Sequence, residues 1–310
     1  MEIVYGHRNA PAWDGAAIAI GNFDGVHLGH RALIARAREL AAGRRALTVA
    51  LTFDPHPSAL LAPAHAPAML TSIARRVELL AAAGVDAVVV EPFTRELAGA
   101  SPDAFVDEVV IGGLHARAIV VGYDFSYGQG RTGNVEALRA HGAQAGIEVA
   151  IVSPVTIDGE IASSTKVRGH LRAGELAQAE RMLGRPWDVD GVVVHGAERG
   201  RAIGIPTANI TPEVELAIAP GIYAVTLSVD GGPAMPAVAS LGTNPTFVDA
   251  GRLVLEVHVL DWSGDLYDRR VRTTFVARLR DEQKFDSVEA LVARIARDIT
   301  DARAALARRA

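Results

Sequence analysis

The order of strand-like and helix-like segments changes near residue 184, and this change constrains the fold of the 310-residue chain. Up to residue 183, short apolar runs typical of buried strands alternate with stretches that carry apolar residues at helical spacing. We expect strands at 16–22, 46–53, 86–91, 117–122 and 147–153, and helices at 29–42, 72–83, 102–111, 134–145 and 165–183. The alternation predicts an α/β domain, a parallel sheet with helices on both faces.

After the sequence Gly184-Arg185-Pro186 the chain is rich in Val, Thr and Gly, and turn signals separate short strand-like runs. These runs lie at 187–195, 221–229, 234–241, 253–260 and 271–279. Their number and spacing predict a small antiparallel β-barrel domain. A final helix is expected at 287–308, where apolar residues recur every three or four positions on one face. We therefore predict two domains, 1–183 and 184–310.

Composition narrows the class of protein. The net charge is −5, which argues against nucleic acid or an anionic membrane as a partner. Because the chain has no cysteine, disulfides, thiolate metal sites and a cysteine nucleophile are excluded. No apolar signal core occupies residues 1–15, and the longest apolar runs are strand-sized. We expect a cytoplasmic protein.

The segment GNFDGVHLGH at 21–30 follows the first expected strand and leads into the first expected helix. Three glycines let the backbone approach a ligand closely, and the start of a helix attracts phosphate through unpaired N–H groups. Two imidazoles stand at that helix start. The alternative is a loop with two surface histidines. The motif predicts a phosphate site made by Gly21, Phe23, Asp24, Gly25, His27, Gly29 and His30.

This string resembles the signature of the nucleotidyltransferase superfamily, in which a His-x-Gly-His element binds ATP or CTP. The resemblance implies a Rossmann-like fold and a reaction type. It leaves the acceptor open.

Two further segments follow expected strands or precede an expected helix. In GYDFSYG at 122–128, aromatic rings between glycines could surround a planar ring, although a tight turn with packed aromatics explains them equally well. In SSTKVR at 163–168, hydroxyls can simply cap a helix, but capping does not explain two cations. Hydroxyls and cations at a helix start suit a polyphosphate. The residues in question are Asp124, Phe125, Tyr127, Ser164, Thr165, Lys166 and Arg168.

The C-terminal part contains HGAERGRAIGIPTANI at 195–210. Thr207 and Asn209 face the same way on an extended segment and offer hard oxygen ligands for Mg²⁺ beside substrate phosphates. A strand edge with a proline kink is the structural alternative. In the expected strand 253–260, Glu256 must face a polar site or solvent, and we expect His258 to be a hydrogen-bonded barrel histidine. A Gly-rich cover for phosphates would include Arg199, Gly200, Arg201 and Gly204.

Together, these segments and their order resemble the bacterial bifunctional riboflavin kinase/FAD synthetase family. Further strings that resemble the kinase half are GIY at 221–223, SLGTNPTF at 240–247, EVH at 256–258 and DLY at 265–267. The sequence departs from the family pattern at Tyr127, Lys166 and Ile205, where Phe, Arg and Phe are more usual. These changes keep a ring, a charge and an apolar side chain.

The resemblance implies that the chain phosphorylates riboflavin to FMN with ATP and then adenylylates FMN to FAD, releasing pyrophosphate. It implies Mg²⁺ at Thr207 and Asn209, and Glu256 as the general base for the flavin hydroxyl. It also implies a flavin-side loop with Arg280, Glu282 and Phe285. Its partners would be small molecules, namely riboflavin, FMN and ATP, and a homo-oligomer is compatible with the family.

Two other functions remain open. A different nucleotidyltransferase, such as a cytidylyltransferase or a pantetheine-phosphate adenylyltransferase, would share the first motif but would not need residues 184–310. A non-catalytic flavin-binding regulator would tolerate the loss of Thr207, Asn209 and Glu256, all of which are present.

Overall fold

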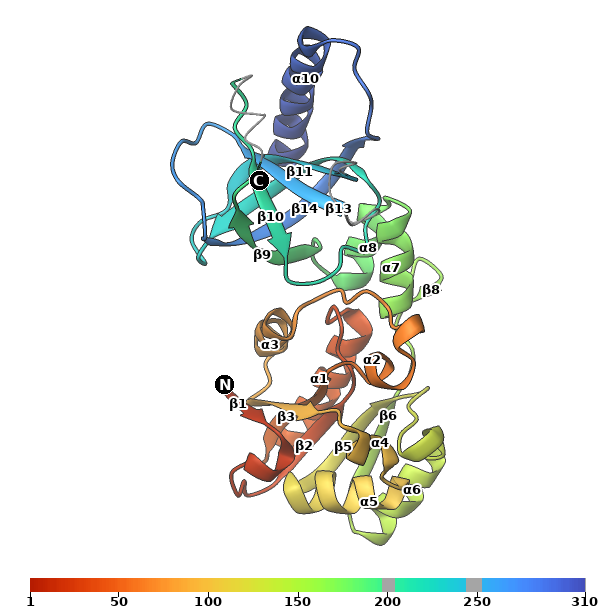
Figure 1. The fold of residues 1–310 in the computed structure, drawn as a ribbon. Coiled ribbons are helices and arrows are strands. Elements are labelled where there is room, and N and C mark those ends of the chain that lie inside the picture. Colours follow the sequence, from red (N-terminus) through yellow and green to blue (C-terminus); the bar gives the residue numbers. More distant parts are fainter. Residues whose placement is uncertain (197–203, 244–252, 310) are drawn as a thin grey trace. The chain divides into compact units, whose positions relative to one another are not determined.

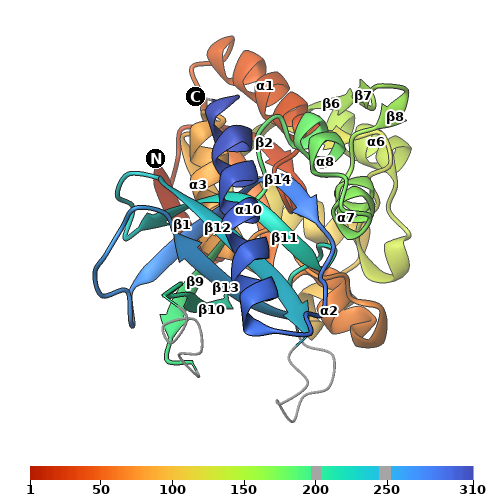
Figure 2. The same ribbon diagram turned by 90° about the horizontal axis from the view of Figure 1, so that it is seen from above.

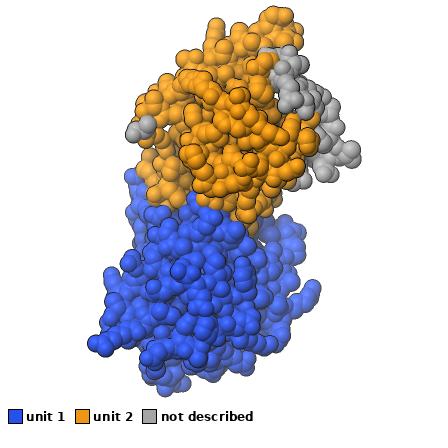
Figure 3. Space-filling model, turned by 90° about the vertical axis from the view of Figure 1, so that its left-hand side faces the viewer, with its two compact units in different colours: residues 1–67, 73–163 blue, residues 68–72, 164–310 orange. Residues whose placement is uncertain are grey.

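The computed structural model describes residues 1–196, 204–243 and 253–309. Contacts between residues divide the chain into two compact units (Figure 3). Unit 1 contains residues 1–67 and 73–163, and unit 2 contains residues 68–72 and 164–310. The contact division groups 164–183 with the C-terminal part, whereas the sequence placed them in the first domain. The predicted boundary after residue 183 separates two functions and stays a prediction.

Unit 1 is built on a six-stranded parallel sheet with the order β1-β4-β3-β2-β5-β6 (Figure 1). The strands are β1 (Glu2–Tyr5), β2 (Ala16–Ile20), β3 (Leu47–Asp54), β4 (Ala87–Pro92), β5 (Ala116–Gly122) and β6 (Glu148–Val152). β2 is buried along its whole length, which explains its continuous apolar sequence. The chain runs from β2 through β3 to β4 and then returns to β5 on the other side of β2. The carboxyl ends of β2 and β5 therefore mark the point where ligands bind in sheets of this kind.

Helices cover both faces of this sheet. On one face, apolar residues of α1 (Leu28–Ala42) and α3 (Ile73–Ala82) pack on alternate sheet residues such as Ala17 and Ala19. On the other face, a π-helix (Phe105–Gly113) and α6 (Val135–Gln144) pack on Ile18 and Ile20. The remaining short elements are η1 (His7–Asn9), α2 (Pro57–Leu61), η2 (Pro63–His65), α4 (Arg95–Gly99), α5 (Pro102–Ala104), η4 (Gln129–Arg131), β7 (Thr156–Ile157) and β8 (Glu160–Ile161).

Unit 2 begins with two helices, α7 (Ser164–Arg172) and α8 (Leu176–Leu183), where the sequence predicted one. The break falls at Gly174, whose φ of 76° only glycine adopts readily. A β-carbon at this position would also lie 2.8 Å from Arg278 Cδ. Gly184, at φ 68°, ends α8 in the left-handed conformation common at helix C-termini.

The rest of unit 2 is a closed antiparallel barrel with the order β10-β13-β12-β11-β14-β9. Its strands are β9 (Asp188–Val194), β10 (Ala208–Pro212), β11 (Gly221–Val229), β12 (Met235–Thr243), β13 (Leu253–Val259) and β14 (Arg270–Arg280). The rings of Trp187, Tyr223 and Phe275 are buried, and that of Phe275 contacts the other two. The helix α10 (Val288–Ala307) lies over β11, β12 and β14 (Figure 2) and packs its Ala302 and Ala305 on Ile222 and Ala224. The predicted fold class, an α/β domain followed by a small barrel with a C-terminal helix, is confirmed.

Candidate functional sites

The first candidate site lies in unit 1 at the carboxyl end of β2. Gly21 follows the strand, and its N–H donates to the carbonyl of Leu51 on β3. The chain then turns through three positive-φ residues, Phe23, Gly25 and Val26, before α1 begins at Leu28. The N-terminus of α1 therefore follows directly on the carboxyl end of β2, as the sequence predicted.

His27 and His30 form one unit at the start of α1. His27 is the N-cap, and its Nδ1 accepts a hydrogen bond of 3.4 Å from the backbone N–H of His30. The two rings stack with centroids 3.6 Å apart, and the ring of Phe23 packs edge-on against His30. A β-carbon on Gly29 would lie 3.0 Å from the His27 ring and 3.2 Å from the carbonyl oxygen of Ala162. A side chain at this position would therefore crowd the His27 ring.

His30 is held in the neutral form. Burial, followed by the charges of His27 and Arg76, keeps the pKa of His30 well below its ordinary value. Its Nδ1 is buried and makes no hydrogen bond within the part of the chain that the structure describes. A ring nitrogen at a helix N-terminus is well suited to a phosphate oxygen.

Arg76 is a residue of this site that the sequence analysis missed. It lies on α3 and is 3% exposed, with Nη2 4.0 Å from the buried carboxylate of Asp24. Its Nη1 donates to Thr52 Oγ1 and to the carbonyl of Phe53. The arginine therefore joins the turn between β2 and α1, the candidate phosphate site, to the end of β3. The helical spacing of Ile73, Val77 and Leu80 places position 76 on the buried face, so the signal was present in the sequence.

The loop after β5 carries the predicted flavin residues Asp124, Phe125 and Tyr127. Asp124 is exposed, whereas Tyr127 is 7% exposed and stacks on Phe125 with centroids 5.4 Å apart. Tyr127 also contacts Phe105 of the π-helix, and its ring leaves no room for a side chain at Gly133. Burial and the charge of Asp103 raise the pKa of Tyr127. The alternative of a tight turn with packed aromatics thus explains the burial and the ring contacts of Tyr127. Its role at a flavin stays a prediction.

The predicted phosphate residues at 164–168 lie in unit 2. Ser164 and Thr165 open α7, with Thr165 exposed. Arg168 is 6% exposed, and its Nε donates to the carbonyl of Ala68 at 2.7 Å. The same segment, residues 68–72, accepts a hydrogen bond at the carbonyl of Leu70 from the indole of Trp187. Arg168 therefore holds the segment 68–72 through this hydrogen bond. Its role in binding ATP stays a prediction.

The second candidate site is on the outer face of the barrel. Asn209 of β10 stands opposite Glu256 of β13, and Glu256 stands opposite Ser240 of β12. Residues opposite one another on neighbouring strands point to the same side. Burial alternates along β13, with Leu255 and Val257 buried and Glu256 half-buried. The carboxylate and the amide therefore share one partly exposed face of the barrel.

The donors on this face suit Mg²⁺. Thr207, two residues before Asn209, supplies a hydroxyl and Asn209 an amide oxygen, both half-buried. A β-carbon on Gly196 would collide with the Asn209 side chain, so glycine makes room for the amide. Within the described residues, no group of three or more His, Cys, Asp or Glu side chains could hold a metal. An ion at this site would draw its other ligands from substrate phosphates and water, which is common for Mg²⁺.

The structure describes only part of the predicted phosphate cover but all of the predicted flavin loop. Gly204 turns with a φ of 76°, but Arg199, Gly200 and Arg201 lie outside the described residues. Arg280 binds Asp298 of α10 through Nε and Nη2 at 2.9 and 2.7 Å, and its guanidinium carbon lies 5.9 Å from the ring centre of Phe285.

Glu282, in the same loop, lies against Gly242 of β12, where a β-carbon would collide with its carboxylate. Desolvation raises the pKa of Glu282, against the effect of Arg280. The roles of Arg280, Glu282 and Phe285 toward a flavin stay predictions.

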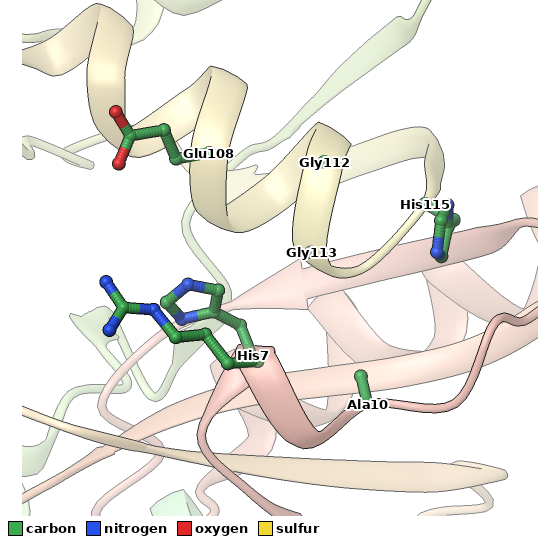
Figure 4. Close-up of a pocket in the computed structure, with 7 residues that line it drawn as sticks. His7, Ala10, Glu108, Gly112, Gly113 and His115 are labelled. Atoms are coloured by element: carbon green, nitrogen blue, oxygen red, sulfur yellow. The ribbon is translucent and has the colours of Figure 1, made fainter.

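The pocket shown in Figure 4 is a separate feature of unit 1. His7 at this pocket is already held by Glu91, which accepts from its backbone N–H at 2.7 Å and contacts its Nδ1 at 2.8 Å. None of the predicted site residues lines this pocket, whose walls are His7, Arg8, Ala10, Glu108, Gly112, Gly113 and His115.

Comparisons with known proteins match the two parts of the chain to two different families. Residues 9–166 match the FAD synthetase family model, and residues 183–306 match the riboflavin kinase family model. A bifunctional riboflavin kinase/FMN adenylyltransferase from Pseudomonas fluorescens is 40% identical over 98% of this chain and 97% of its own length. The protein of that name from Escherichia coli K12 is 39% identical over 98% of this chain and 97% of its own length.

A crystal structure from Streptococcus pneumoniae, described as a macrolide-efflux protein, has a TM-score of 0.86 and 29% identity, with 98% of this chain and 99% of that chain covered. No helix in the described part of the present chain is long and apolar enough to cross a membrane. The matches to both halves, and the relatives that span nearly the whole length, place the chain in the bifunctional riboflavin kinase/FMN adenylyltransferase family.

Proposed function

We propose that the chain makes FMN at the outer face of the barrel and FAD at the carboxyl end of the parallel sheet. The family supplies the two activities, riboflavin kinase and FMN adenylyltransferase. What supports the assignment of the kinase to the barrel face is one observation: Asn209 and Glu256 are neighbours across two strands, on a face that also carries Thr207.

In the proposed kinase step, Glu256 accepts the proton of the 5′-hydroxyl of riboflavin. The hydroxyl oxygen forms a bond to the γ-phosphorus of ATP, and the bond from that phosphorus to the β,γ-bridging oxygen breaks, which releases ADP. Thr207 and Asn209 hold Mg²⁺, which when bound neutralises phosphate charge. Phosphoryl transfer depends mainly on alignment and charge neutralisation, and a base next to oxygen donors supplies both.

The test of this site is Glu256→Gln, which keeps the shape of the side chain and removes the base. We expect riboflavin kinase turnover to fall by roughly 10²–10⁴-fold, while adenylylation of added FMN continues. The matched control is Glu215→Gln, an exposed glutamate of the same unit. Equal loss of both activities, or unchanged kinase turnover, would contradict the assignment.

In the proposed adenylylation step, a phosphate oxygen of FMN bonds to the α-phosphorus of ATP, and pyrophosphate leaves as the bond to the α,β-bridging oxygen breaks. The acceptor is already an anion, so the site needs no base. His27 and His30, with the N-terminus of α1, stabilise the charge that grows on the phosphates. Their stacking at the helix start supports this role.

Replacing both histidines by alanine tests the second site. With riboflavin, ATP and Mg²⁺ supplied, chromatography should show that FMN accumulates and FAD does not form. His65→Ala, an exposed histidine of the same unit, serves as the control. FAD formation at the unmodified rate by the double variant would remove the site from unit 1.

The remaining assignments follow the family resemblance. We propose that Ser164, Thr165 and Arg168 contribute to ATP binding for adenylylation, and that Asp124 and Phe125 lie on the flavin side of that site. Gly204, together with Gly200 and Arg201, would cover ATP in the kinase, and the loop with Arg280, Glu282 and Phe285 would face riboflavin.

A further inference from the structure

His258 is a barrel residue whose contact lies at the kinase site. It follows Glu256 by two positions on β13 and therefore shares its outer face. Its Nδ1 is 2.8 Å from the backbone carbonyl oxygen of Pro206. Because a carbonyl only accepts, Nδ1 carries the hydrogen and donates it. The expectation of a hydrogen-bonded barrel histidine is confirmed, and its partner immediately precedes Thr207.

The backbone pairing of β10 with β13 stops just before this stretch of chain. The ladder between β10 and β13 ends at the pair Ala208 and Val257. Pro206 has no N–H to donate, so backbone pairing cannot continue regularly through it. Thr207 therefore lies between the last ladder pair on one side and the His258 bond on the other. The imidazole contact anchors the chain just before Thr207, beyond the last pair of the ladder with β13.

We propose that His258 is a positioning residue for the riboflavin kinase, which fixes the Thr207 hydroxyl beside Asn209 and Glu256 by holding the carbonyl of Pro206. This inference rests on the proposed function, in which Thr207 and Asn209 hold Mg²⁺. One strand, β13, then carries the base and also sets the place of a metal ligand on the neighbouring strand. In this proposal His258 acts through the carbonyl of Pro206 rather than by direct contact with substrate or metal.

Two variants separate the hydrogen bond from the bulk of the ring. His258→Leu fills similar space and removes the donor, whereas His258→Asn keeps an N–H close to the position of Nδ1. For the full chain, we expect His258→Leu to raise the Mg²⁺ concentration for half-maximal kinase rate about three- to tenfold, the worth of one hydrogen bond. His258→Asn should restore most of the difference, and the rate of FMN adenylylation should be unchanged in both.

A second measurement does not depend on turnover. Hydrogen–deuterium exchange, followed by mass spectrometry without Mg²⁺ or ATP, reports how firmly residues 204–210 are held. Exchange of the amides of Thr207 and Ala208 should be faster in His258→Leu and close to the unmodified rate in His258→Asn. Near-ultraviolet circular dichroism of each variant shows that the barrel is folded.

Thr207→Ala distinguishes failure of this inference from failure of the proposed function. If Thr207→Ala raises the Mg²⁺ requirement while His258→Leu leaves it unchanged, the positioning role is overturned and the metal assignment stands. If the leucine and asparagine variants are shifted equally, the hydrogen bond is not the cause and the role is likewise overturned. If Thr207→Ala leaves the Mg²⁺ requirement unchanged, the metal assignment fails, and the role of His258 falls with it.

Discussion

Asp298 joins the C-terminal helix to the barrel, and its removal gives the largest stability change that we expect in unit 2. The carboxylate is 2% exposed and lies on α10. It accepts from Arg280 Nε at 2.9 Å, from Arg280 Nη2 at 2.7 Å and from Arg294 Nε at 3.0 Å. The change Asp298→Ala leaves both guanidinium groups without this carboxylate.

The two arginines differ in how easily they can recover. The side chain of Arg294 is 28% exposed and can turn to water, but that of Arg280 is only 11% exposed. The cost is therefore that of breaking one buried ion pair, about 3–5 kcal/mol. For a unit of this size such a loss lowers the melting temperature by roughly 10 °C. The double variant Arg280→Met with Asp298→Leu removes both buried charges and should recover much of the loss, since apolar replacements of a buried pair are often near neutral.

Urea unfolding monitored by tryptophan fluorescence measures these costs. In a Trp13→Phe background, the remaining tryptophans, Trp187 and Trp262, both report unit 2. Asp261→Asn is the matched control, because Asp261 also pairs with α10, through Arg303, but with both side chains well exposed, and asparagine suits its positive φ, so no measurable change is expected. A cost for Asp298→Ala as small as that of the control, or a double variant no more stable than the single one, would refute the reasoning.

Two other predictions follow from single contacts. Gly242→Ala should displace the carboxylate of Glu282 and raise the KM for riboflavin in the kinase, while adenylylation of FMN is unaffected. An unchanged KM would mean that the position of Glu282 against Gly242 is not required for riboflavin binding. The pKa of His30 in the folded chain lies well below 6.5, so as the pH falls the unfolded chain takes up this proton first. The contribution of neutral His30 to the free energy of unfolding is therefore fully present above pH 6.5 and is lost as the pH falls below it. His30→Gln should therefore flatten the pH dependence of unit 1 unfolding below pH 6.5, and identical slopes would contradict the proposed protonation state.

The sequence predicted those parts of the fold that depend on local patterns. Strand–helix alternation and continuous apolar runs located β2 to β6 to within about two residues, and the turn signals located most barrel strands. β1 was missed because only Val4 of its four residues is buried, which leaves no periodic pattern to detect. The break between α7 and α8 was missed because Gly174 is a single interruption in an otherwise helical pattern, and the close approach of Arg278 to it is a tertiary contact.

In the candidate sites, too, local features could be predicted from the sequence and tertiary contacts could not. The turn proposed to bind phosphate was predictable as a structure, because strand, turn, cap and helix are consecutive in sequence, and the structure places His27 at the N-cap. The pairing of Asn209 with Glu256 depends on the register between β10 and β13, which the sequence does not contain. The hydrogen bonds of Arg280 to Asp298 are also tertiary. They give a structural role to an arginine that the sequence analysis assigned to the flavin.

The chemical difference between the two acceptors accounts for the different design of the two proposed sites. A ribityl hydroxyl must lose a proton as it attacks, and the barrel face places a carboxylate opposite Asn209, a proposed metal ligand. A phosphate monoester attacks as an anion, and the sheet site has a stacked imidazole pair at a helix start. With the pKa of His30 held low in the free chain, the His30 ring stays neutral until an anion arrives. The phosphates of ATP would then favour the protonated form, so positive charge develops at this site when the nucleotide is bound.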